Sequence, residues 1–178
     1  MKETILKILK LTVTLLIICA GVAAVLAGVN AITKDKIAAI QVEKTQQAIS
    51  QVLPDVSGLE QLTLSGDTGI VKSVYKADNG YAVEVAPNGF DGAVTMMVGI
   101  SDGKVTGISV ISHTETPGLG AVAAANNAKG EAFRGQFVGQ SGTLEIGNQI
   151  DAMSGATITS RAVVAGVNAA LEYVENLG

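Results

Sequence analysis

The chain has 178 residues, 48% of them hydrophobic, which is enough for one domain with a packed core and a short additional segment. Aromatic residues make up 3%, Trp is absent and the formal net charge is −4, which argues against a nucleic-acid-binding surface. One His and one Cys leave little from which to build a zinc site or a Cys–His catalytic pair, so no metal ligand is predicted.

The first predicted element is a transmembrane helix over residues 11–31, LTVTLLIICAGVAAVLAGVNA, which is uncharged and long enough to cross the hydrocarbon core. Residues 1–10 hold lysines against a single glutamate, so the positive-inside rule predicts a cytoplasmic N-terminus. The remaining chain is then expected on the outer, or periplasmic, side of the cell (inner) membrane. A cleaved signal peptide is the alternative, but its apolar core is usually shorter.

Residues 32–58 are predicted to form a membrane-proximal helix and linker. The helix, over residues 33–53, continues from the anchor and has a partial apolar stripe. Pro54 and Gly58 are expected to end it. The helix is interpreted either as a spacer or as a docking surface for a neighbouring chain.

The last predicted region is residues 59–178, and within it the hydrophobic period changes from helix to strand at Gly69. Four strands are predicted, over residues 70–77, 81–86, 93–100 and 104–111. The first two flank Asp78-Asn79-Gly80 and the last two flank Ser101-Asp102-Gly103, and both triplets are typical of hairpin turns. The sequence therefore predicts an antiparallel sheet.

Helices and one more strand are predicted after this sheet. The expected elements are an irregular loop over 112–120, an alanine-rich helix over 121–127, a strand within 142–150 and a final helix over 161–176. Phe133 and Phe137 are expected in the core. The predicted class is α+β, with one N-terminal transmembrane helix followed by a small antiparallel-sheet domain packed by helices.

The segment DAMSGATITS, which begins at Asp151, leads into the predicted final helix. Gly155 and Ala156 leave the approach to the helix open, and a helix N-terminus favours a phosphate group. Three hydroxyl side chains are able to cap the free N–H groups of the helix: Thr157, Thr159 and Ser160. The residues alone leave both a plain cap and a phosphate site open.

The loop HTETPGLG holds two titratable side chains, His113 and Glu115. An acid–base pair is one interpretation of these groups. A structured loop in which they bond backbone groups is the other, and Pro117 with its neighbouring glycines favours it.

Taken together, ETPGLG and DAMSGATITS resemble the FMN-binding domain of bacterial redox subunits. These are the G subunit of the Rnf complex and the C subunit of the sodium-pumping NADH:quinone reductase. The resemblance covers nearly the whole chain, and the short length favours the Rnf type. The flavinylation pattern of these subunits (Asp, two variable residues, Ser or Thr, Gly, Ala, Thr or Ser) is matched by Asp151, Ser154, Gly155, Ala156 and Thr157.

The resemblance implies that FMN is covalently bound through its phosphate to the Thr157 hydroxyl. A separate flavin transferase would attach it from FAD, and Asp151 would be recognised by that enzyme or would orient the segment. The residues implied to lie along or near the flavin are Glu115, Thr116, Gly118, Leu119 and, less directly, His113. Thr159 and Ser160 then remain as helix caps, and Phe133 stands where the family often has Trp. No catalytic acid or base is implied, because the cofactor carries the electron chemistry.

The implied function is electron transfer within a membrane-bound, ion-translocating ferredoxin:NAD oxidoreductase complex, with other subunits of that complex as partners. The alternatives are the C subunit of a quinone reductase, a stand-alone flavin reductase, and a non-redox anchor or assembly protein whose hydroxyls only cap a helix.

Overall fold

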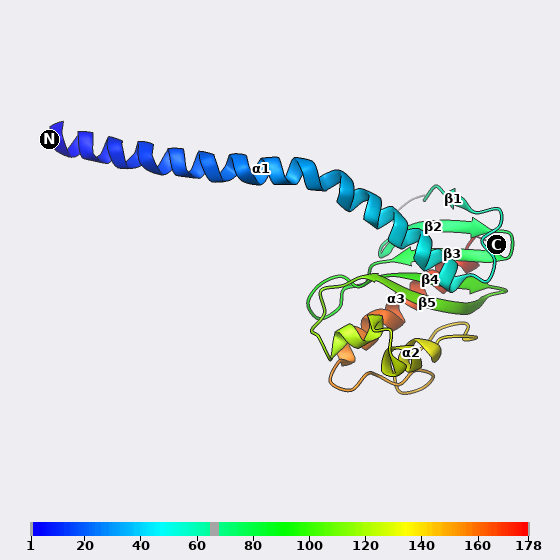
Figure 1. Ribbon diagram of the computed structural model, residues 1–178. Coiled ribbons are helices and arrows are strands. Elements are labelled where there is room, and N and C mark those ends of the chain that lie inside the picture. Colours follow the sequence, from blue (N-terminus) through cyan, green and yellow to red (C-terminus); the bar gives the residue numbers. More distant parts are fainter. Residues whose placement is uncertain (1, 65–67, 178) are drawn as a thin grey trace. The chain divides into compact units, whose positions relative to one another are not determined.

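The computed structural model describes residues 2–64 and 68–177 (Figure 1). Met1, residues 65–67 and Gly178 lie outside the described residues, so the predicted regions 1–10 and 59–178 are not covered completely. The chain divides into two compact units, Met1–Glu43 and Lys44–Gly178.

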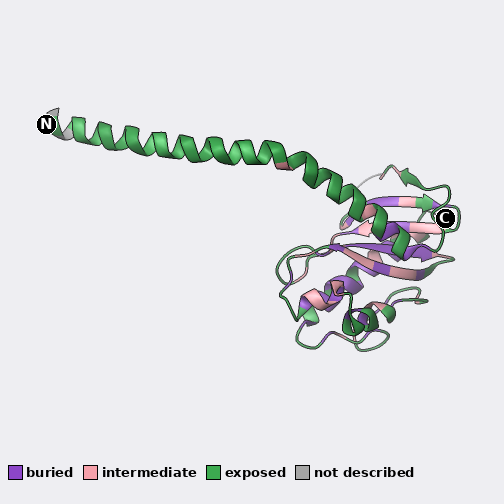
Figure 2. Ribbon diagram, in the orientation of Figure 1, coloured by how far each residue is buried: buried purple, intermediate pink, exposed green. Residues whose placement is uncertain are grey.

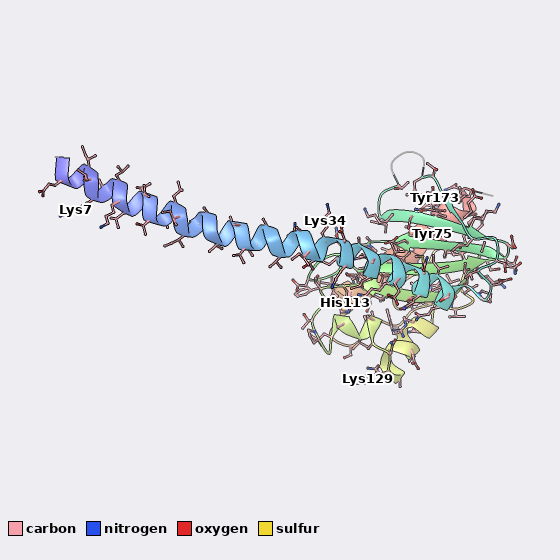
Figure 3. All side chains as sticks on the ribbon, turned by 45° about the horizontal axis from the view of Figure 1, so that its top comes forward. Lys7, Lys34, Tyr75, His113, Lys129 and Tyr173 are labelled. Atoms are coloured by element: carbon pink, nitrogen blue, oxygen red, sulfur yellow. The ribbon has the colours of Figure 1, made fainter. Side chains whose placement is uncertain are left out.

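A single helix, α1 (Lys2–Val52), forms the first unit and continues into the second, so the predicted anchor and the helix after it are one element. It includes a stretch long and apolar enough to cross a membrane. Figure 2 shows this stretch exposed almost throughout, and in Figure 3 Lys7 and Lys34 lie on either side of the uncharged residues 11–31. The hydroxyls of Thr12 and Thr14 donate to backbone carbonyls one turn earlier, which satisfies these groups within an apolar segment.

Five antiparallel strands form one sheet in the order β1-β2-β3-β4-β5. Their bounds are β1 (Glu60–Leu62), β2 (Val71–Ala77), β3 (Gly80–Val85), β4 (Thr95–Ser101) and β5 (Lys104–Ser112). The four predicted strands and both hairpins are confirmed, and the exposed edge strand β1 is an addition. Asp102 (φ 51°) and Gly103 (φ 69°) form a two-residue turn with the positive φ angles of a type I′ hairpin.

The two faces of the sheet are covered by different helices (Figure 1). On one face, the end of α1 places Ile49 and Val52 against Ala82 and Met97. Gly99 lies so close to the backbone of Val52 that no side chain fits there. The end of the membrane-proximal helix therefore docks on the sheet of its own domain.

The other face of the sheet packs against α3 (Thr157–Glu175). Successive side chains of a strand point to opposite faces of the sheet, which explains why there are two core clusters. Met96 and Met97, for example, point to opposite faces and belong to different clusters. Phe133 and Phe137 complete this larger core, as predicted, with their rings edge to face at a centroid distance of 5.5 Å.

Three predictions for the C-terminal half are wrong. The alanine-rich segment is only a short 3₁₀ helix, η1 (Gly120–Ala124), and an unpredicted helix, α2 (Ala128–Gly135), follows it with Asn127 as its N-cap. Within the described chain, residues 142–150 form no strand, only an isolated bridge. Gly142 and Gly147, at φ 69° and 84°, turn that segment away from an extended path. The third error, the start of α3, concerns the site.

Candidate functional site

The first turn of α3 begins at Thr157 rather than at the predicted Arg161. Ala156 occupies the cap position, and none of the described side chains caps this helix end. The prediction that Thr159 and Ser160 cap the helix is therefore wrong. Thr157 is exposed at the first helical position, beside backbone N–H groups to which no described side chain bonds as a cap. An exposed hydroxyl at such a position fits a phosphoester well.

Thr159 and Ser160 point into the protein and are almost completely buried. The Thr159 hydroxyl donates to the Glu115 carboxylate at 2.6 Å. The Ser160 hydroxyl donates to the carbonyl of Ala156 at 2.9 Å and accepts from the N–H of Met153 at 2.9 Å. These bonds set the rotation of α3 and tie the preceding loop to its first turn.

The segment before the helix is a tight turn that exposes Ser154 and Gly155. The N–H of Ala156 donates to the carbonyl of Met153 at 3.0 Å, and Gly155 has a left-handed φ of 73°. A Cβ at Gly155 would lie 3.0 Å from Cδ2 of Leu119. The fold thus brings the two sequence motifs together at this point.

Within the loop of residues 113–120, Thr116, Gly118 and Leu119 are exposed. The carbonyl of Thr116 accepts from the N–H groups of Leu119 and Ala121 at 3.2 Å, which holds the loop as a compact turn. His113, labelled in Figure 3, is half-buried, and its Nδ1 has no hydrogen-bond partner among the described residues.

Glu115, in contrast, is buried and faces the interior. Its Oε1 accepts from the N–H groups of Phe90 at 2.8 Å and Asp91 at 3.3 Å, while Oε2 accepts from Thr159. The carboxylate that the resemblance places along the flavin is therefore occupied by groups of the protein itself. The interpretation of this loop as a structured one whose His and Glu bond backbone groups fits the contacts of Glu115, whereas Nδ1 of His113 bonds no described group.

Several residues of the site were missed by the sequence patterns. Gln136 holds the backbone of Asp151, accepting from its N–H at 2.7 Å and donating to its carbonyl at 3.4 Å. The Asp151 side chain itself is exposed. Gln136 carried no sequence signal, because its partner lies in another loop.

Arg161 is the second residue that the patterns missed. It lies four residues after Thr157, on the same face of α3, and is exposed. Because side chains of a helix lean toward its N-terminus, helix geometry predicts that Arg161 lies on the side of the turn that contains Thr157. No described residue forms an ion pair with it. The i, i+4 spacing was the signal that could have found it.

Three large apolar residues in the segments that form the site are exposed: Leu119 lies beside Gly155, Ile158 follows Thr157, and Phe90 donates its N–H to Glu115. Leu119, Ile158 and Phe90 are 44%, 52% and 68% exposed, although large apolar residues are usually buried. A cavity of about 1020 Å³ lies elsewhere, between the hairpin turns and the C-terminal half of α3, and neither motif contributes to its lining. The site at Thr157 is therefore an exposed helix end that suits a phosphate, with exposed apolar residues in the adjoining segments.

Comparison with known proteins identifies the domain. The FMN-binding domain family matches residues 89–172. The chain is 34% identical to the G subunit of the ion-translocating oxidoreductase complex of Methanosarcina acetivorans, over 94% of this chain and 95% of that protein. It is also 34% identical to the G subunit of the Na⁺-translocating ferredoxin:NAD⁺ oxidoreductase complex of Acetobacterium woodii, over 96% and 93%. A third relative, the G subunit of the proton-translocating complex of Clostridium ljungdahlii, is 41% identical over 58% of this chain and 60% of its own length.

Proposed function

This chain belongs to the family of G subunits of ion-translocating oxidoreductase complexes, and we propose that it is the electron-transfer subunit of an Rnf-type ferredoxin:NAD oxidoreductase. Similarity over nearly the full length of both chains supports this assignment over a stand-alone flavin reductase or the C subunit of a quinone reductase. Its partners are then the other subunits of the membrane complex.

We infer that FMN is bound covalently at Thr157. The observation that carries this inference is the exposed Thr157 hydroxyl at a helix end without a capping side chain. A flavin transferase would use FAD as the donor. The Thr157 oxygen forms a bond to the FMN phosphorus, the pyrophosphate bond of FAD breaks, AMP leaves, and the hydroxyl proton is released. The resulting phosphodiester keeps one negative charge, which the helix end favours.

Other residues near Thr157 would hold the bound FMN. Arg161 supplies a positive charge beside the phosphate, and Gly155 leaves room for it. Leu119 and Ile158 offer apolar contact to the ring, while Thr116 and Gly118 offer backbone groups. When bound, FMN supplies the electron-accepting and electron-donating chemistry, and the protein positions it. Because the covalent bond retains the cofactor, an enclosed binding pocket is not needed. An exposed site also leaves the flavin ring accessible to redox partners.

The apolar segment of α1 and the family both indicate a membrane protein. We propose that the chain crosses the membrane once, with its N-terminus in the cytoplasm and the FMN-binding domain on the outer side. The lysines before residue 11 support this orientation. A covalent link is useful on that side, where a dissociated cofactor would be lost.

The test is the intact mass of the full chain co-expressed with a flavin transferase. We expect an increase equal to FMN less one water, located in the peptide that contains Thr157, and flavin fluorescence on a denaturing gel. Thr157→Val should abolish both signals, and Thr157→Ser should keep them because it retains a hydroxyl. Thr143→Val, an exposed substitution outside the site, is the control. Flavin retained by Thr157→Val would refute the attachment site.

A further inference from the structure

We propose that Glu115 is a positioning residue for cofactor attachment: through Thr159 it sets the rotation of α3 that turns the Thr157 hydroxyl outward. This inference rests on the proposed attachment at Thr157 and deepens it. It assigns to Glu115 a role inside the protein, instead of the contact with the flavin that the motif resemblance implies.

The first step is the set of bonds that the carboxylate accepts. Two donors, the N–H groups of Phe90 and Asp91, come from the loop before β4, and the third is the Thr159 hydroxyl in α3. Glu115 itself lies in the loop after β5. A single carboxylate therefore connects three segments that are distant in the sequence. An ionised carboxylate suits this place because it only accepts hydrogen bonds and provides two oxygens for them.

The second step is the packing around the carboxylate. A Cβ at Gly89 would overlap Oε1 of Glu115, and a Cβ at Gly120 would overlap both Oε2 and the Thr159 hydroxyl oxygen. A side chain at either position would therefore force the Glu115 carboxylate to move. Since Glu115 is 5% exposed and Thr159 is 1% exposed, their hydrogen bond is shielded from water. Bonds to charged groups in such surroundings are stronger than exposed ones.

The third step is helix geometry. Each residue of an α-helix rotates the side-chain direction by about 100°, so Thr157 and Thr159 point about 200° apart. Fixing Thr159 toward Glu115 in the interior therefore fixes Thr157 toward solvent. Ser160, bonded to the loop at Met153 and Ala156, supplies a second fixed point in the same turn. The Thr157 side chain is thus directed toward solvent before any transferase meets it.

The test compares rates of flavin attachment for the full chain incubated with a flavin transferase and FAD. Thr159→Val keeps the shape of the side chain and removes the donor to Glu115. We expect it to slow attachment at least about tenfold, the effect of losing one hydrogen bond to a charged group. Thr159→Ser restores the hydroxyl and should recover most of the rate. Glu115→Gln should be intermediate, because its amide still has one accepting oxygen for the loop N–H groups.

A matched control separates positioning from loss of stability. Thr106→Val removes a threonine hydroxyl that bonds to the carbonyl of Val52 on the opposite face of the sheet. It should leave the attachment rate within about twofold of the wild type. A wild-type rate for Thr159→Val, or equal slowing by both Val substitutions, would overturn the proposal. If instead the proposed attachment at Thr157 is wrong, the wild-type chain itself will carry no flavin there, which distinguishes that outcome from failure of the positioning role.

Discussion

The Thr159 hydroxyl donates to the Glu115 carboxylate at 2.6 Å, across 44 residues of sequence. This bond joins the ETPGLG loop to the first turn of α3 through the interior of the domain. The two motifs also meet at the surface, where Leu119 packs against Gly155. The proposed attachment at Thr157 would therefore depend on contacts on both sides of the helix end.

Replacement of Arg161 should alter the environment of the attached phosphate. In the flavin-carrying chain, Arg161→Gln removes the positive charge that lies one helical turn after Thr157. We expect the phosphorus NMR resonance of the phosphodiester to shift and to depend less on salt concentration than in the wild type. Lys129→Gln, an exposed charge removal on α2, should leave the resonance unchanged. An identical spectrum for Arg161→Gln would show that this side chain does not contact the phosphate.

Gln136→Ala should slow flavin attachment by releasing the backbone of Asp151. Two side-chain bonds are lost on a partly exposed surface, so we expect a cost of about 1 kcal/mol in the free energy of unfolding. The attachment rate should fall further than this stability loss explains, because the loop that a transferase must bind becomes mobile. Gln149→Ala removes a comparable bond to the N–H of Glu145 and serves as the control. Equal attachment rates for the two variants would contradict a role for Gln136.

Gly120→Ala should destabilise the domain strongly. Its Cβ would overlap the Glu115 carboxylate and the Thr159 hydroxyl, both of which are buried. We expect a loss of roughly 1–3 kcal/mol in the free energy of unfolding, measured by denaturant titration of the full chain in detergent. At Gly135 in α2 a Cβ meets no atom, so Gly135→Ala should be neutral or slightly stabilising. Similar stability of the two variants would show that the Glu115 and Thr159 side chains move aside at little cost in free energy.

The proposed orientation predicts which part of the chain a protease reaches from outside the cell. In spheroplasts, external protease should cleave the domain that follows residue 43 and leave an epitope tag at the N-terminus protected. Reversal of the charge balance in residues 1–10, by replacing the lysines with glutamate, should weaken this orientation. Protection of the domain in intact spheroplasts would place it in the cytoplasm and refute the proposal.

Local sequence patterns were sufficient to predict much of the fold. The anchor follows from an uncharged run of sufficient length, and the hairpins follow from turn residues between alternating strands. Asp102-Gly103 illustrates this, because those residues tolerate the positive φ angles that the turn requires. The short edge strand β1 was missed, since a three-residue exposed segment has no hydrophobic period of its own and depends on pairing with β2.

The errors fall where a partner is distant in the sequence. Residues 142–150 looked like a strand, but Asn168 on α3 binds both backbone groups of Leu144 and holds the segment as a loop. Thr159 and Ser160 looked like caps, since hydroxyl residues commonly occupy that position. They instead bond to interior partners, Glu115 and Met153, and α3 begins two residues before Thr159.

The sequence by itself determined the anchor, the α+β class, the antiparallel sheet and the motif that relates this chain to flavin-carrying subunits, because each depends on neighbouring residues or on a fixed spacing. Only the tertiary structure decided which hydroxyl of the helical segment TITS faces solvent. That choice depends on the rotation of one helix. The rotation is set by a buried carboxylate and two glycines from other segments, which only the folded chain brings into contact.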